Sequence, residues 1–595
     1  MLGMLVVSIL SMVIFFWVLF SGLDSMFESK PYKVKKNTVL HIQLENGLTD
    51  KTNGPDFGFG GMSDMGVGLI DLIDGLDQAK EDDKIEGVFL DLTDVNTGLA
   101  SIQELRAALE DFKSSGKWIV AYGQGEYFSE KALYLASVAN EVYLFPTLVM
   151  EWNGIGVERM FYKETLDKLG VKIQIIRGSN NDFKSAVEPF FLTEMSDSAR
   201  HQTQVLVDNM WANMVANVST ARDIPADSLN KYAEKMTIRT AHDAADLGFV
   251  DGLKYPDEVY GIIMSKVGVD ELEDVHFLDV NKYVFETLIK EDDEKEKKGD
   301  RIAVIMAEGG VNTGKGKEVH STTIAKHIRD ARLDDDVKGI LLRVNSPGGS
   351  ALASDIIWRE VILTKKVKPV YVSMGDVAAS GGYYISCAAD KIYASEGTIT
   401  GSIGVFGMIP YTGDMMKDKL GVTSDFVTTH PHSVLSLNKK LSEEEFGIVQ
   451  EEVDRIYDEF LTRVDDGREK LSKEEVNRIG RGRVWSGTDA LRIGLVDELG
   501  TYQKARKDLL AKLELDDDAV EYFPKRKYPP LLKLKEMFSA FGGGDEDEDD
   551  EEQIQTKSWE NSAIYKAYAI LIQDIQSLDL TPGVKAQLPY TIQIR

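Results

Sequence analysis

A serine followed by two glycines stands between an apolar run and a helical pattern in the second half of the chain. Residues 368–374 are predicted to form a buried strand, and residues 383–389, rich in small and aromatic types, a buried helix. Ser380 then lies on the turn between them, and Gly381 leaves room for backbone N–H groups to approach a substrate oxygen. The pattern fits a nucleophile, and it also fits a serine that only caps a helix.

A lysine among apolar residues is the candidate for a matching base. Lys184 lies in the run from Asp182 to Phe191, beside Phe183 and Val187. A lysine acts as a general base only when its amine is neutral, and desolvation by apolar neighbours lowers its pKa towards that state. Taken alone, the residue also fits a surface lysine ahead of a helix that ends in proline.

A glycine-rich turn supplies candidate donors for an oxyanion hole. The segment Asn345-Ser346-Pro347-Gly348-Gly349 directly follows a predicted strand, and such a turn presents backbone N–H groups. Gly348 and Gly349, together with Gly381, are therefore candidates to hold a developing oxyanion.

A serine–histidine pair is the weaker alternative. His327 lies in a helical pattern, and His430 and His432 lie in a loop-like stretch, so either place could supply a partner for Ser380. No GxSxG motif surrounds the serine. The eight histidines show no HExxH spacing, and Cys387 is the single cysteine, so the sequence predicts no metal site and no intrachain disulfide.

The two halves of the chain repeat each other, which sets the elements that position these groups. Four segments match in order at a nearly constant offset: 72–87 with 324–339, 134–143 with 384–393, 169–171 with 420–422, and 243–251 with 489–497. A tandem duplication follows. Each copy alternates short apolar strands with helical patterns, which indicates an α/β fold.

Each copy has lost a different part of the candidate site. Where the second copy has the glycine turn, the first has residues 93–97 without glycine, and Glu130 stands at the place of Ser380. The position in the second copy that corresponds to Lys184 falls near Leu435, and the nearest lysine there is Lys439. One copy therefore lacks the base and the other lacks the nucleophile.

Length and composition bound the remaining possibilities. The 595 residues suggest about three or four units, and a net charge of -30 argues against nucleic acid as a partner. We expect five parts, with the lysine in the first repeat and the serine in the second: a transmembrane anchor at 1–23, a repeat at 38–290, a charged linker at 291–300, a repeat at 301–525, and a tail at 526–595 with a disordered acidic run.

The charges around the predicted anchor give an ambiguous topology. No Lys or Arg precedes it, whereas Lys30, Lys33, Lys35 and Lys36 follow it. The positive-inside rule would then place the body in the cytoplasm, and a start site assigned too far downstream would explain the same pattern.

Several motifs together resemble a known family. SPGG, GDVAASGGYYIS, TGSIGVFG (400–407), FKSAVEPF and RVWSG (483–487) are similar to the long, duplicated form of signal peptide peptidase A, also called protease IV. The resemblance extends from the anchor to about residue 525. It implies a Clp/crotonase-like (ββα-spiral) fold in each repeat, a homotetramer, and a serine endopeptidase anchored in the cytoplasmic membrane with its body on the outer, periplasmic side.

The resemblance also implies roles for individual residues. The nucleophile motif falls on Ser380, the base motif on Lys184, and the oxyanion turn on Gly349 with the N–H beside the serine. It implies no cofactor or metal, and as substrates the signal peptides left in the membrane after preprotein cleavage, with other apolar peptides. Tyr383, Phe406, Met408 and Ile409 are candidates to line an apolar cleft, although any one of them could be a core residue.

Two rival classes remain open at this point. An enoyl-CoA hydratase-like enzyme would use glycine-turn N–H groups on a thioester enolate, with acidic residues as acid and base and no need for Ser380. A non-catalytic membrane scaffold would keep the duplication for assembly alone.

Overall fold

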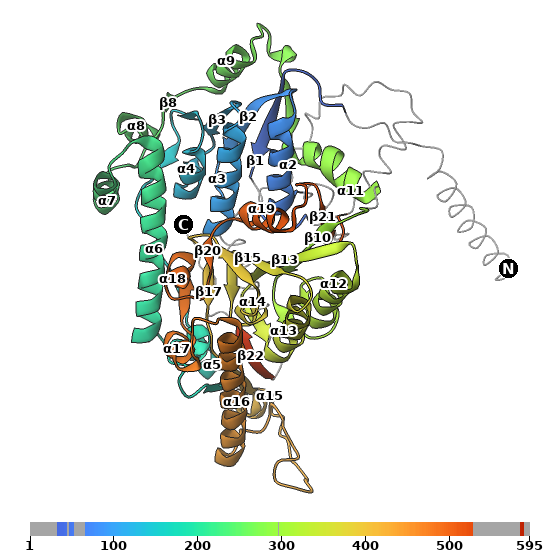
Figure 1. Ribbon diagram of the computed structural model, residues 1–595. Coiled ribbons are helices and arrows are strands. Elements are labelled where there is room, and N and C mark those ends of the chain that lie inside the picture. Colours follow the sequence, from blue (N-terminus) through green and yellow to red (C-terminus); the bar gives the residue numbers. More distant parts are fainter. Residues whose placement is uncertain (1–32, 45–46, 53–65, 295–296, 527–582, 588–595) are drawn as a thin grey trace, which may run out of the picture.

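The computed structural model describes residues 33–44, 47–52, 66–294, 297–526 and 583–587 (Figure 1). The predicted anchor at residues 1–23 and the acidic run at 545–552 lie outside these ranges. Within them, no helix is both long and apolar enough to cross a bilayer.

Two parallel sheets with the same strand order form the centres of the two repeats. The first has the order β8-β5-β3-β2-β1-β9 and the second the order β20-β16-β15-β13-β10-β21. The strands of the first are β1 (Thr38–Gln43), β2 (Ile85–Leu92), β3 (Trp118–Gly123), β5 (Glu141–Leu144), β8 (Gly252–Leu253) and β9 (His276–Asp279). Those of the second are β10 (Arg301–Glu308), β13 (Val337–Ser346), β15 (Val370–Ala379), β16 (Lys391–Ala394), β20 (Glu498–Leu499) and β21 (Val520–Phe523).

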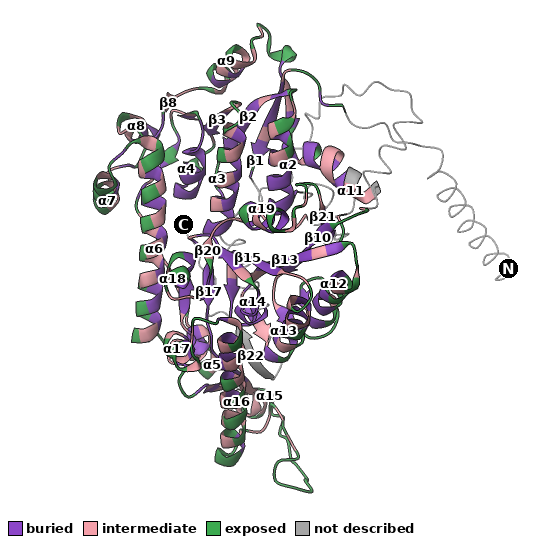
Figure 2. Ribbon diagram, in the orientation of Figure 1, coloured by how far each residue is buried: buried purple, intermediate pink, exposed green. Residues whose placement is uncertain are grey.

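The central strands are apolar along their length because helices cover the sheets. Figure 2 shows the strands of both sheets buried, with exposed residues on the outward faces of the helices. The helices of the first repeat are α2 (Leu69–Glu81), α3 (Leu99–Lys113), α4 (Glu130–Ala136), α5 (Lys163–Leu169), α6 (Asp197–Arg222), α7 (Ala226–Glu234), α8 (Ala241–Asp246), α9 (Pro256–Val267) and α10 (Val280–Val284). Those that follow are α11 (Lys290–Glu294), α12 (Ser321–Leu333), α13 (Ala351–Lys365), α14 (Gly381–Ser386), α15 (Gly413–Leu420), α16 (Glu443–Gly467), α17 (Lys473–Ile479), α18 (Gly487–Arg492) and α19 (Tyr502–Leu513).

A third sheet joins the two repeats. Its order is β12-β11-β14-β22-β18-β7, and β7 (Lys172–Arg177) of the first repeat pairs antiparallel with β18 (Phe406–Tyr411) of the second. The other members are β11 (Val311–Asn312), β12 (Val319–His320), β14 (Gly348–Ser350) and β22 (Gly583–Gln587). β7 pairs with a strand of the second repeat in this sheet. The segment that follows β7, which includes Lys184, therefore lies next to the second repeat.

Short strands complete the fold. β17 (Ile399–Gly401) extends the second sheet beside β15, β19 (Val484–Ser486) pairs with β17, and β4 (Tyr127–Phe128) pairs with β6 (Val149–Met150).

The described part of the expected linker contacts the first residue of the expected tail. Residues 291–294 of the charged segment belong to α11 (Lys290–Glu294), and Asp292 lies 2.9 Å from Arg526. Arg526 also pairs with Asp71 and Asp74 of α2, so the start of the tail is held on the first repeat. The charge of residues 291–300 predicts a solvated segment. Asp292 nevertheless makes an ordered contact, because Arg526 supplies an opposite charge from a distant part of the chain.

Candidate active site

Ser380 stands at the junction of β15 and α14. Its φ of 57° and ψ of -113° put a non-glycine residue in a sparsely populated region, which the surrounding structure must hold in place. Its backbone N–H donates to the carbonyl of Gly401 at 2.8 Å. The side chain makes no capping hydrogen bond to α14, so the simple role of a helix cap does not account for this serine.

Lys184 contacts the serine directly. Its Nζ lies 2.8 Å from Ser380 Oγ, 3.0 Å from the carbonyl oxygen of Ser402 and 2.9 Å from Ser402 Oγ. Both Lys184 and Ser380 are completely buried, so the lysine is not a surface residue. Burial lowers the pKa of Lys184 well below its usual value, because desolvation disfavours the charged amine.

The second repeat holds the backbone around Lys184. The Phe183 N–H donates to the carbonyl of Arg481 at 3.1 Å. A Cβ on Gly482 would lie 2.5 Å from the Cβ of Lys184, so only glycine fits against the lysine there. From α6, Gln202 Nε2 donates to the Phe183 carbonyl at 3.0 Å and to Ser185 Oγ at 2.9 Å. The 3-10 helix Ser185–Phe190 follows and contains the expected proline.

The predicted oxyanion glycines lie beside the serine. A Cβ on Gly381 would be 3.1 Å from both Gly348 Cα and Gly349 N, so the start of α14 packs directly against the glycine turn. Gly348 has φ 97° and Gly349 has φ 156°, and a Cβ on Gly349 would lie 2.2 Å from the carbonyl oxygen of Val311. Both conformation and space therefore require glycine at position 349.

Ser402 lies within the 400–407 motif, and the sequence alone does not predict a role for it. It has φ 52°, and its N–H donates to the Arg483 carbonyl at 2.7 Å. This turn aims both the carbonyl and the hydroxyl of Ser402 at the amine of Lys184. The dense run of small residues in that motif was the feature that could have pointed to it.

The histidine candidates lie elsewhere. The ring of His327, on α12, packs 5.7 Å from that of Phe523, centroid to centroid. His430 Nδ1 lies 3.1 Å from Thr429 Oγ1, and His432 Nε2 lies 3.4 Å from Glu444. Within the described part of the chain, the side chain in contact with Ser380 Oγ is that of Lys184.

Two of the four candidate lining residues belong to an apolar cluster next to Lys184. Phe406 and Met408 on β18 pack with Val187, and Ile173, Ile175, Ala186, Phe190 and Phe191 pack against them. Ile409 belongs to the margin of the core of the second repeat. Tyr383 is a core residue: it is completely buried and its hydroxyl donates to the Leu495 carbonyl at 2.9 Å.

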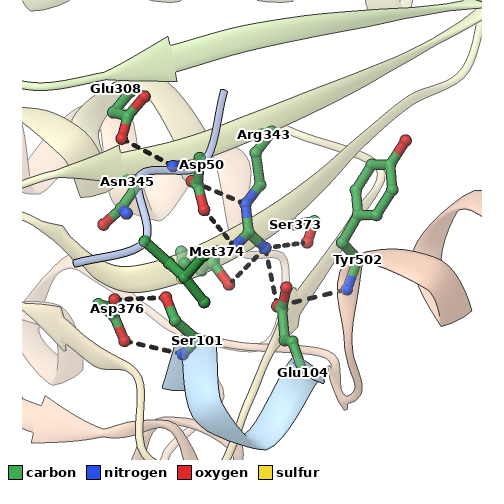
Figure 3. A network of polar contacts seen from close by, with 12 residues as sticks. Asp50, Ser101, Glu104, Glu308, Arg343, Asn345, Ser373, Met374, Asp376 and Tyr502 are labelled. Atoms are coloured by element: carbon green, nitrogen blue, oxygen red, sulfur yellow. Dashed lines mark hydrogen bonds and ion pairs between the residues drawn. The ribbon is translucent and has the colours of Figure 1, made fainter. Parts of the chain in front are cut away.

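A buried ionic network joins the repeats at the sheet that carries Ser380 (Figure 3). Arg343 on β13 donates to both carboxylate oxygens of Asp50, at 3.0 and 2.9 Å, and to Glu104 at 2.8 Å. Asp376 on β15 accepts from the N–H of Ser101 at 2.9 Å, at the start of α3. Burial raises the pKa of Glu104 to about 7, although Arg343 opposes the shift.

The described residues contain no group of three or more His, Cys, Asp or Glu side chains that could hold a metal ion. The chemistry that this arrangement offers is that of a hydroxyl beside a desolvated amine, with backbone N–H groups at the neighbouring glycines.

Comparison with known proteins decides the family. Residues 111–270 and 362–516 match Peptidase family S49. The chain is 38% identical to Protease 4 of Salmonella typhi, over 75% of this chain and 72% of that protein. It is 36% identical to Protease 4 of Haemophilus influenzae, over 74% of this chain and 72% of that protein.

The chain belongs to peptidase family S49. It is a serine peptidase of the signal peptide peptidase A type, with one family region in each half. A chloroplast relative, Serine protease SPPA of Arabidopsis thaliana, is 28% identical over 82% of this chain and 71% of its own length. A ClpP1 mutant from Listeria monocytogenes is 17% identical, covers 34% of this chain and 93% of its own, and has a TM-score of 0.24. Membership of a peptidase family favours a serine peptidase over the hydratase-like and scaffold alternatives.

Proposed function

We propose that Ser380 and Lys184 form the catalytic dyad of this S49 peptidase and that the enzyme degrades cleaved signal peptides. The observation that carries the dyad is the 2.8 Å contact between a buried amine and a buried hydroxyl. A neutral amine has two N–H donors and one lone pair. The two donors match the carbonyl and hydroxyl of Ser402, which leaves the lone pair for the Ser380 proton.

The reaction then proceeds through an acyl-enzyme. Neutral Lys184 takes the proton from Ser380 Oγ, and this oxygen attacks the carbonyl carbon of the scissile peptide bond. The N–H groups of Gly349 and Gly381 hold the oxyanion, with Gly348 shaping the turn. The ammonium of Lys184 protonates the leaving amine as the C–N bond breaks. Water then attacks the ester, Lys184 takes the proton of that water, and Ser380 recovers it.

The substrate class has both a physical and a comparative basis. The cluster of Phe406, Met408 and Val187 provides an apolar surface beside Lys184, and signal peptides have apolar centres. A relative from Enterococcus faecium, 37% identical over 36% of this chain and 63% of its own length, is named Putative signal peptide peptidase SppA. Degradation of a synthetic signal peptide in detergent by the purified chain tests this assignment, and failure to cut it would contradict the substrate.

We further propose that residues 1–23 anchor the enzyme in the cytoplasmic membrane, with its body on the periplasmic side. The length and apolarity of this segment support the anchor, and the side rests on the family resemblance. A reporter fusion at the C-terminus that is active only in the cytoplasm would contradict the orientation.

The Clp/crotonase-like fold of each repeat and a homotetramer complete the proposal. Exposed apolar side chains between α15 and α16, such as Val427 and Leu435, would be covered by a neighbouring copy. Light scattering of the detergent-solubilised chain should give four times the mass of one chain, and the mass of a monomer would contradict the assembly.

The dyad is tested by two substitutions with a matched control. Ser380→Ala and Lys184→Met should each lower kcat by about a thousandfold or more, because each removes a group that acts only with the other. Lys131 is a second buried lysine, whose Nζ donates to the Thr97 carbonyl at 3.1 Å in the first repeat. Lys131→Met should retain activity, and a Lys184→Met enzyme as active as this control would contradict the dyad.

A further inference from the structure

The turn that precedes β19 lies against the segment that carries Lys184. Arg481 has φ 55° and Gly482 has φ 77°, so two successive residues are in the left-handed region. Glycine adopts this conformation without strain, whereas an arginine in it must be held by its surroundings. The Arg481 N–H donates to Tyr457 Oη of α16 at 3.2 Å, and the Gly482 N–H donates to the Ile403 carbonyl at 2.7 Å. Both anchors of the turn belong to the second repeat.

Arg481 makes three contacts with the two residues that precede Lys184. Its guanidinium donates to both carboxylate oxygens of Asp182, to Oδ1 at 2.8 Å. The guanidinium also lies 5.3 Å from the centre of the Phe183 ring, and the Arg481 carbonyl accepts the Phe183 N–H at 3.1 Å. A planar guanidinium binds a carboxylate in a defined orientation, so the pair fixes direction as well as distance. One residue of the second repeat therefore holds both side chain and backbone immediately before the lysine.

The first repeat has the same turn with different side chains. The match between residues 243–251 and 489–497 places Lys235 opposite Arg481 and Met236 opposite Gly482. Met236 has φ 47° and is 41% exposed, so a left-handed residue at this position is common to both repeats. In the second repeat a Cβ at this position would lie 2.5 Å from the Cβ of Lys184. The second repeat thus has a glycine where the lysine packs, and an arginine beside it.

The ion pair stands at the boundary between solvent and the buried lysine. The side chains of Asp182 and Arg481 are 44% and 38% exposed, whereas Lys184, two residues further along the chain, is completely buried. Water that reached the amine would stabilise its charged form. Loosening of residues 182–183 would give water such a path, because these residues connect the exposed pair to the lysine.

We propose that Arg481 is a positioning residue for the dyad: by holding Asp182 and Phe183, it keeps water from the Lys184 amine and so keeps that amine neutral. This inference rests on the proposed function, because it takes Lys184 as the base. Arg481 acts through the lysine segment and takes no part in proton transfer. The second repeat, which supplies the nucleophile, thereby also maintains the active form of a base that comes from the first.

The test compares Arg481→Met, Asp182→Asn and the double variant. Arg481→Met keeps an apolar stem and removes the guanidinium, and Asp182→Asn removes the charge of its partner at nearly the same size. Arg455→Met is the matched control, because Arg455 on α16 makes the same bidentate contact with Glu452, at 2.9 and 2.6 Å. For each protein, kcat/KM is measured from pH 6 to 10 on a peptide without titratable groups, and a thermal melt checks that the protein is folded.

The loss of activity should depend on pH. Arg481→Met should lower kcat/KM about tenfold at pH 7 and less than about twofold at pH 10, because high pH restores the neutral amine. Asp182→Asn, which leaves the arginine in place, should show a smaller loss of the same form. The double variant should be no worse than Arg481→Met, since both substitutions break one contact. Arg455→Met should match the wild-type enzyme throughout.

Three results would overturn the proposal. The first is equal kcat/KM of Arg481→Met and Arg455→Met at pH 7. The second is a loss from Arg481→Met that is the same at every pH, and the third is a double variant in which the losses from the two single substitutions multiply. Failure of the dyad itself would look different, because kcat/KM of the wild-type enzyme would then not rise with pH.

Discussion

Burial lowers the pKa of Lys184, which is the property that a lysine needs to act as a general base. Desolvation is the cause of the lowered pKa of Lys184. Burial also lowers the pKa of Lys131, although Asp94 and Asp376 oppose part of that shift. The burial of Lys184 in the folded protein thus has a direct chemical consequence, because it favours the neutral amine that a general base requires.

The pH dependence of activity follows from that shift. Because only the neutral amine accepts a proton, kcat/KM should rise with pH through the lowered pKa of Lys184 and level off well below pH 10.5, the usual value for lysine. Initial rates on a peptide without titratable groups, measured from pH 5 to 11, would show this. A rising limb with its midpoint near pH 10.5 would mean that the amine is not desolvated.

We infer from its two contacts with the amine that Ser402 positions Lys184 in the proposed dyad. Ser402→Ala removes one of three contacts of the amine and leaves the carbonyl of the same residue in place. We expect kcat to fall about tenfold with little change in KM, the loss of roughly one hydrogen bond. Ser386→Ala, which removes a buried hydroxyl that bonds to Gly382 in α14, is the control. A Ser402→Ala enzyme with the kcat of this control would refute the positioning role.

The elements that hold the site come from both repeats, and a buried charge cluster locks them together. Arg343 on β13 neutralises Asp50 and Glu104 of the first repeat, and the start of α3 contacts Asp376, four residues before Ser380. Arg343, Asp50 and Glu104 are each at most 1% exposed. The same contacts that join the repeats therefore fix the strand from which the nucleophile projects.

Substitution of Arg343 should lower the free energy of unfolding of the protein. Arg343→Met leaves two buried carboxylates without their cation, which costs about 3–5 kcal/mol of unfolding free energy. The loss should be larger at pH 8 than at pH 6, because at lower pH the raised pKa of Glu104 lets the folded state bind a proton and relieve the charge. Chemical denaturation at both pH values checks this. Arg455→Met, on the exposed face of α16, should change stability by less than about 0.5 kcal/mol, and equal effects of the two substitutions would contradict the role of the network.

The whole molecule is a duplicated α/β protein in which the two copies have diverged around one site. Much of it follows from the sequence: the repeat is visible in four matched segments, and the apolar run and glycines around Ser380 predict the strand, turn and helix that the structure has. The contact between Lys184 and Ser380 cannot be predicted from either repeat alone. It is predicted only when the two repeats are compared, because one lacks the base and the other lacks the nucleophile.

Other features depend on contacts that no local pattern contains. The orientation of Ser402 comes from a positive φ imposed by the pairing of Ser402 with Arg483. The ordering of α11 depends on Arg526, more than two hundred residues away, and β22 is a short segment whose strand conformation comes from its two neighbours. Each is set by tertiary structure rather than by propensity.

The most direct measurement is covalent labelling of the intact chain. A serine-directed acylating probe should modify wild-type protein once, and peptide mass spectrometry should place the label on Ser380. Lys184→Met should be labelled at least a hundredfold more slowly, while Lys131→Met should be labelled at the wild-type rate. Labelling at another residue, or equal rates in the two lysine variants, would contradict the claim that an uncharged amine from the first repeat activates a hydroxyl of the second.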